Sequence, residues 1–224
     1  VAKHLRELDI EVQTGVAGHG VVGLLRGGKP GPVVALRADM DALPVTEKTG
    51  LPYASQVTAA YGDKEVGVMH ACGHDAHVAI LMGTAEVLAG VREDLAGTVK
   101  FIFQPAEEGA WPAPEWGAKL MITEGVLENP KVDAIFGLHV WSSMPSGVIG
   151  LRSGPVMASS DFIRITVTGK QTHAAAPWAG IDPITVSSQI ILGLQTVASR
   201  QVNILGSPSV VSIGAALNRM EPAR

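Results

Sequence analysis

The sequence has little cysteine, no long apolar run and no concentrated charge. Its single cysteine, Cys72, excludes an internal disulfide. Apolar runs such as 78–82 fall far short of the roughly 18 residues that a membrane-spanning helix needs. No basic run is longer than a pair, and 17 basic against 21 acidic residues give a net charge of −4, unlike the basic surface of a nucleic-acid binder. We therefore expect neither a membrane nor a nucleic acid as a partner.

The composition is that of a folded protein. Hydrophobic residues make up 46% of the 224 residues and charged residues 17%, which excludes a disordered or collagen-like chain. The first eight residues have the pattern of an amphipathic helix and not that of a secretory signal, and the sequence is expected to be a piece of a longer chain. The cellular compartment stays open at this point, with the cytoplasm favoured.

Apolar runs alternate with helical patterns in the first half of the chain. Short β-branched or aromatic runs bounded by Gly, Pro or Asp predict buried strands at 33–36, 99–103 and 134–138. A helix is expected over 75–88, with Ile80, Leu81, Ala85 and Leu88 on one face, and another over 116–127. This succession predicts an α/β fold with a mostly parallel sheet.

The pattern changes beyond residue 157. Residues 162–168 alternate apolar and polar side chains, as a half-exposed strand does, and 209–213 predict another strand. Between them, Asp182 and Pro183 supply a cap and a first-turn proline for a long helix. We therefore expect two domains, a catalytic, metal-binding domain over 1–157 and a smaller α+β domain over 158–224.

Residues that can bind a metal follow the predicted strands. Cys72 and His74 lie two residues apart around a glycine, and a thiolate and an imidazole are good ligands for a borderline-soft divalent metal. The pair Glu107 and Glu108 follows the strand at 99–103, and His139 closes the strand at 134–138. Each of these alone is more often structural. Together they favour a metal site, because ligands gather at the carboxyl ends of parallel strands.

Two further carboxylates and one further histidine are less specific. Asp39 and Asp41 follow the strand at 33–36, where they could orient ligand histidines, pair with Arg37 or cap the loop. His173 lies among small residues in the second domain, where a loop histidine is usually just exposed.

These motifs resemble the metal-dependent amidohydrolases related to aminoacylase and carboxypeptidase G, in the subgroup that contains hippurate hydrolase and the auxin-conjugate (IAA-amino acid) hydrolases. The resemblance extends over nearly the whole chain. The motifs that carry it occur in the family's order at Arg37–Pro44, Met69–Asp75, Gln104–Gly109, Gly137–His139 and Gly169–Pro177.

The resemblance implies a zinc-peptidase-like catalytic domain with two divalent metal ions, and an inserted lid domain through which two subunits form a homodimer. Zinc is favoured by the thiolate, although manganese or cobalt is possible. The implied ligands are Cys72, His74, Glu108 and His139. Glu107 is implied as the general base that deprotonates the attacking water, and His173 as the group that stabilises the oxyanion, reaching the site of the partner subunit. Asn218 is implied as a residue that holds a substrate carboxylate.

One implied ligand is not found. The family takes a further histidine from its C-terminal segment, and this sequence has none after His173, so that ligand either lies beyond Arg224 or is absent. The predicted activity is hydrolysis of the amide of N-acyl amino acids or similar small, peptide-like conjugates. A hydrolase that uses Cys72 as nucleophile, and a dimerising homologue or fragment without activity, remain alternatives.

Overall fold

The computed structural model describes residues 1–109, 115–157, 159, 161–203, 206 and 209–217. Contacts divide the chain into two compact units, Val1–Ser146 and Gly147–Arg224. Asn218, the expected substrate-binding residue, lies outside the described residues. No helix in the described ranges is both long enough and apolar enough to cross a bilayer.

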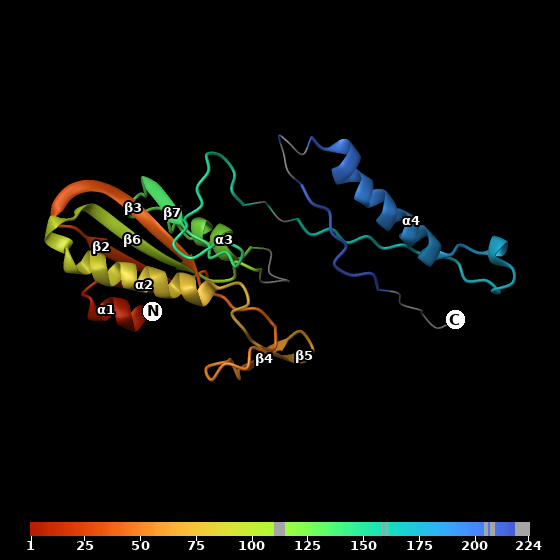
Figure 1. The fold of residues 1–224 in the computed structure, drawn as a ribbon, viewed down its shortest axis with the longest axis horizontal. Coiled ribbons are helices and arrows are strands. Elements are labelled where there is room, and N and C mark those ends of the chain that lie inside the picture. Colours follow the sequence, from red (N-terminus) through yellow and green to blue (C-terminus); the bar gives the residue numbers. More distant parts are fainter. Residues whose placement is uncertain (110–114, 158, 160, 204–205, 207–208, 218–224) are drawn as a thin grey trace. The chain divides into compact units, whose positions relative to one another are not determined.

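A five-stranded sheet forms the centre of the first unit (Figure 1). Its order is β1-β2-β6-β3-β7, and β3 pairs in parallel with both β6 and β7, whereas β2 is antiparallel to β1 and β6. Four of the five strands, all but β2, therefore point the same way. The strands are β1 Glu11–Val16, β2 Gly20–Arg26, β3 Lys29–Asp39, β6 Ala96–Gln104 and β7 Ala134–Gly137. The expected α/β class with a mostly parallel sheet is confirmed.

Two helices cover one face of the sheet, and a third packs on the other. Helix α1 (Ala2–Glu7) and helix α2 (His74–Gly90) share a buried core with the sheet, built around Phe101 and Phe103 of β6. Helix α3 (Gly117–Thr123) packs Met121 against Ile102 on the opposite face. A short 3-10 helix η1 (Arg92–Asp94) follows α2. Parallel strands need this cover on both faces, since both sets of their side chains are apolar.

The helix predictions need two corrections. On α2 the side chains of Leu81 and Ala85 are buried as expected, but Ile80 is exposed, because the buried face continues through His74 and His77 instead. The helix expected over 116–127 ends at Thr123, and Gly125 follows with φ of 82°, a left-handed conformation that stops a helix.

Two hairpins in the first unit were not predicted. Strands β1 and β2 are joined by the turn Ala17–Gly18–His19, and strands β4 (Thr58–Tyr61) and β5 (Lys64–Gly67) by Gly62–Asp63. Glycine-containing turns between short β-branched runs are the usual sequence signal for hairpins. That signal was present around residues 17–19, where valine and threonine flank the turn, whereas at 62–63 only the Gly–Asp turn itself was present.

The second unit contains helices and no strand in its described residues. Helix α4 (Pro183–Thr196) begins as expected, with Asp182 as its cap, and continues into a π-helical turn η3 (Val197–Gln201). A 3-10 turn η2 (Pro177–Ala179) precedes it. The strands expected at 162–168 and 209–213 are wrong for this structure, because neither segment has a neighbouring strand to complete its backbone hydrogen bonds.

Candidate metal centre

The candidate centre lies where the three parallel strands end. Asp39 at the end of β3 is opposite Gln104 at the end of β6, and Gly137 at the end of β7 is opposite Arg37. The first turn of α2 begins beside the same edge. Gly73, which caps α2, has φ of 81°, and a Cβ there would lie 2.4 Å from the Cγ2 of Val140. Only glycine therefore allows the segment after β7 to approach the start of α2.

His74 carries the least satisfied polar atom at this edge. Its Nδ1 lies 3.0 Å from the backbone oxygen of Asp41 and 3.1 Å from that residue's Oδ1. Both atoms are acceptors, so Nδ1 carries the hydrogen and Nε2 carries a lone pair. That Nε2 is buried and has no hydrogen-bond partner, and it lies 3.9 Å from Glu107 and 4.0 Å from Glu108. A buried lone pair facing carboxylates is the arrangement that a cation would complete.

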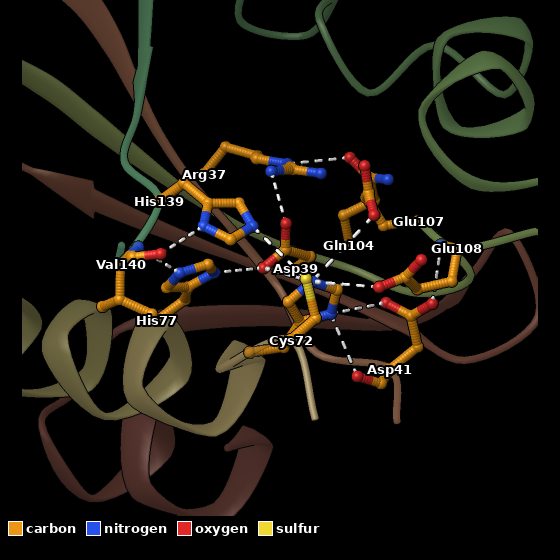
Figure 2. A network of polar contacts seen from close by, with 11 residues as sticks. Arg37, Asp39, Asp41, Cys72, His77, Gln104, Glu107, Glu108, His139 and Val140 are labelled. Carbon is orange, nitrogen blue, oxygen red and sulfur yellow. Dashed lines mark hydrogen bonds and ion pairs between the residues drawn. The ribbon is translucent and has the colours of Figure 1, made fainter. Parts of the chain in front are cut away.

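His139 brings a second imidazole nitrogen to the same place. Its Nδ1 lies 2.6 Å from the backbone oxygen of Val140, so it donates there, and its Nε2 lies 3.4 Å from the Sγ of Cys72. Figure 2 shows Cys72, His139 and the glutamates around one space. The strand end at β7 and the loop before α2 therefore present a nitrogen and a sulfur to one another.

The Cys72 side chain is held as a neutral thiol in this arrangement. Burial, together with the hydrogen bond and the negative charge of Glu108, raises the pKa of the thiol to about 11. A cysteine that acts as a nucleophile at neutral pH has a lowered pKa instead. A bound divalent cation reverses this electrostatic balance, because it attracts the thiolate that the carboxylates disfavour.

Asp41 connects two of the candidate ligand segments. Besides its contacts with His74, its Oδ2 accepts the backbone N–H of Glu108 at 3.0 Å. Glu108 is consequently anchored through its main chain, while the side chain of Glu107 is the more exposed of the pair, at 42% against 30%. Asp41 thus orients one imidazole and positions the loop that follows β6.

Asp39 makes one of the contacts that the sequence left open, the pair with Arg37, and its imidazole partner is His77, which is not one of the expected ligand histidines. Its Oδ2 accepts from Arg37 Nη1 at 2.7 Å, and its Oδ1 lies 2.5 Å from His77 Nδ1 (Figure 2). Burial alone would raise the pKa of this carboxyl, but the hydrogen bond from His77 and the charge of Arg37 outweigh burial and lower it. Asp39 is therefore an ionised, buried carboxylate that accepts a hydrogen bond from His77 of α2.

The donor set fits a divalent metal. Within the described ranges, one possible ligand group is formed by Cys72, His74 and His139, and another by His74, Glu107 and Glu108; in each group the ligand atoms lie within 4.8 Å of one another. The two groups share His74. Thiolate, imidazole and carboxylate together are the ligands that zinc and similar divalent ions bind.

The remaining site residues fall elsewhere or were missed. His173 lies in the second unit, where its Nδ1 accepts the backbone N–H of Ala175 at 3.1 Å. His77 was not singled out in the sequence, although its spacing of three residues from His74 places both on one face of a helix. That spacing was the available signal.

Comparison with known proteins gives the same family as the motifs. A family model described as peptidase family M20/M25/M40 matches residues 35–219. Thermostable carboxypeptidase 1 of Saccharolobus solfataricus is 47% identical over 214 residues, which are 95% of this chain and 51% of that protein. N-acetylcysteine deacetylase of Bacillus subtilis is 48% identical over 194 residues, which are 87% of this chain and 47% of that protein.

A solved structure is also similar. The crystal structure of the Bacillus subtilis YXEP protein, described as a dinuclear metal binding peptidase from the M20 family, has a TM-score of 0.63 and 40% identity, covering 87% of this chain and 48% of that one. The chain spans about half the length of the curated relatives it matches. The family model covers most of the chain, including the ends of β3, β6 and β7, so the chain belongs to peptidase family M20/M25/M40.

Proposed function

We propose that the protein of which this chain is a part hydrolyses the amide bond of N-acyl amino acids or similar small, peptide-like conjugates, using two divalent metal ions. The observation that carries the proposal is the buried, unpartnered Nε2 of His74, which faces Glu107 and Glu108 at the edge where Cys72 and His139 also meet. Relatives named as a deacetylase and a carboxypeptidase support the substrate class.

Four residues would hold the metals. They are Cys72, His74, Glu108 and His139. When bound, divalent cations lower the pKa of a water molecule and polarise the carbonyl that it attacks. The mixed thiolate, imidazole and carboxylate set favours zinc, with manganese or cobalt as alternatives.

Glu107 is the proposed general base. Its carboxylate lies 3.9 Å from His74 Nε2 and is more exposed than its neighbour Glu108, whose main chain is tied to Asp41. An untied, partly solvated carboxylate beside the ligands can accept the proton of the attacking water and deliver it to the leaving amine. Adjacent glutamates thereby take different roles, one as a ligand and the other as a proton carrier.

The second half of the proposal concerns residues 158–224. We propose that they belong to a lid domain through which two subunits associate, with residues 1–157 contributing the catalytic part. His173 would stabilise the oxyanion in the site of the partner subunit, and Asn218 would bind a substrate carboxylate. The resemblance of Gly169–Pro177 to the family motif supports the role of His173.

Metal analysis of the full-length protein tests the centre directly. We expect two divalent ions per subunit in the wild type and fewer in Cys72→Ser, measured by elemental analysis. Chelation should abolish hydrolysis of N-acetyl amino acids, and adding metal should restore it. A protein that retains no metal would contradict the proposal and favour the homologue without activity.

Glu107→Gln separates chemistry from binding. We expect the metal content to stay at the wild-type level while kcat falls by about 10²–10⁴-fold, because only proton transfer is removed. The matched control is Glu7→Gln. Glu7 is an exposed glutamate of α1, distant in sequence from Glu107, and its substitution should leave kcat unchanged. Activity that survives both chelation and Glu107→Gln but is lost on alkylation of Cys72 would instead establish a cysteine nucleophile.

A further inference from the structure

His77 lies beside the candidate ligands, but both of its ring nitrogens are already used. The side chain is 1% exposed, its Nδ1 contacts Asp39 Oδ1 at 2.5 Å, and its Nε2 accepts the backbone N–H of Val140 at 2.8 Å. A backbone N–H can only donate, so Nε2 must carry the lone pair and Nδ1 must carry the hydrogen. No lone pair of the ring is then left for a cation, although Asp39, His74 and His77 are close enough to be grouped as possible ligands.

His74 and His139 have the same tautomer as His77, but their Nε2 lone pairs are not bound to the main chain. Nδ1 of His74 donates to Asp41 and Nδ1 of His139 donates to Val140, so each Nε2 keeps its lone pair. One of these Nε2 atoms is unpartnered and the other faces a sulfur. Only the Nε2 of His77 is directed at the main chain.

The main-chain group that His77 holds belongs to the segment carrying His139. The register of β3 with β7 ends at Gly137, so His139 and Val140 lie beyond the strand ladder. Val140 donates to His77 through its N–H and accepts from His139 through its C=O, while its side chain packs on Gly73. The imidazole of His139 is thus attached to a peptide that α2 holds in place.

Asp39 in turn is held from the sheet. Arg37 donates to Asp39 through Nη1 and to Gln104 Oε1 through Nε at 2.8 Å. A continuous chain of polar contacts therefore runs from the end of β6 through β3 and α2 to the segment after β7 (Figure 2). His77 is the member of that chain that reaches the backbone beside a candidate ligand.

We propose that His77 is a positioning residue, which fixes the imidazole of His139 by accepting the N–H of Val140 and does not itself bind metal. The inference rests on the metal centre proposed above. Its physical basis is that outer groups which orient a ligand contribute to metal affinity, typically by 10–100-fold.

Two substitutions separate this role from packing and from direct ligation. His77→Phe keeps the ring and removes the acceptor, whereas His77→Gln places an amide oxygen near the position of Nε2. In the full-length protein freed of metal, hydrogen exchange at the Val140 amide should become at least about tenfold faster in His77→Phe and stay near the wild-type rate in His77→Gln. Exchange at β6 amides should not change and controls for folding.

Cobalt(II) binding gives the second readout, followed through the absorption of a cobalt–thiolate bond. We expect affinity about 10–100-fold weaker in His77→Phe, with unchanged stoichiometry, and near the wild-type value in His77→Gln. Unchanged Val140 exchange in His77→Phe would overturn the proposal. Loss of one cobalt equivalent in both variants would overturn it in favour of direct ligation by His77.

Two outcomes need a separate measurement. If His77→Phe does not fold, His77→Asn replaces it, since its shorter side chain keeps a donor for Asp39 but does not reach Val140. If the wild type binds no cobalt, the metal centre itself fails, and exchange at Val140 alone then decides whether His77 holds the His139 segment.

Discussion

The two units of the chain differ in how much of their apolar surface is covered. In Val1–Ser146 the core includes Phe101 and Phe103, both 0% exposed, between helices and sheet. Among the described residues from 147 to 217, none is buried, and Phe162 is 83% exposed. Among the described residues of the second unit, regular structure forms where local signals suffice, as at α4. The strands that the structure describes, which need a distant partner, all lie in the first unit.

The largest expected effect comes from matched truncations of the two phenylalanines. Phe101→Ala should destabilise the protein by about 3–5 kcal/mol, because it removes a fully buried ring from the core. Phe162→Ala should change stability by no more than about 0.5 kcal/mol, since its ring is mostly in water already. Denaturant midpoints measured on both variants check this. Equal losses would show that Phe162 is covered in the full-length protein.

Lys100 offers the next largest effect. This β6 lysine is 3% exposed and donates to the backbone oxygens of Val126, Glu128 and Pro130 at 2.7–3.0 Å. Lys100→Met should cost about 2–4 kcal/mol, because it leaves these carbonyls without their donor. Lys170→Met, at an exposed position of the second unit, is the control and should be nearly neutral in the same denaturation experiment.

Local sequence predicts most of the strands and helices of both units. The errors arise where an element depends on a neighbouring strand that the sequence pattern does not reveal. Strands β3, β6 and β7 were predicted because each is a short apolar run with clear ends, and α4 because Asp182 and Pro183 mark its start. Strands at 162–168 and 209–213 were wrongly predicted, because alternation describes a strand's faces and says nothing of whether a neighbour is present.

The candidate centre follows the same division. Convergence of Glu108 and His139 could be predicted, because residues after parallel strands share an edge. Cys72 and His74 reach that edge from the loop before α2 and from its first residue, not from the end of a parallel strand. The role of His77 could not be predicted, since it depends on a backbone N–H of Val140 that only the folded chain brings within 2.8 Å. Sequence patterns identify side chains that can bind a ligand. A side chain that holds a backbone group, as His77 does, can be identified only once the folded structure is known.

Acid should weaken the first unit through Asp39. The pKa of this buried carboxyl is lowered in the folded protein, below its usual value near 3.8. The unfolded chain therefore binds the proton more readily, so the stabilisation is complete above that value and is lost as the pH falls through the lowered pKa. Denaturant midpoints of the metal-free protein should fall in acid, and less steeply in Asp39→Asn. If the midpoint falls equally steeply with pH in the wild type and in Asp39→Asn, Asp39 does not contribute to the acid dependence of stability.

The smallest effect is expected at Asp182, where the second unit depends on a local contact. Its carboxylate accepts from the hydroxyl of Thr185 and from the N–H of Ile184, and these bonds lower its pKa. Asp182→Ala should speed hydrogen exchange at the first amides of α4 and leave the unfolding midpoint of the first unit unchanged.

Acidification should act on the same cap in the wild type only. Because the pKa of Asp182 is lowered, the cap holds above the usual carboxyl pKa and fails as the pH falls through the lowered one, whereas Asp182→Ala has no such carboxyl to titrate. The control is Asp161→Ala, an exposed aspartate of the same unit outside any helix. If hydrogen exchange at the Ile184 amide is unchanged in Asp182→Ala, the side chain of Asp182 does not stabilise the start of α4. The described part of the second unit would then depend on a partner for its helix too, as the apolar residues at 162–168 already do.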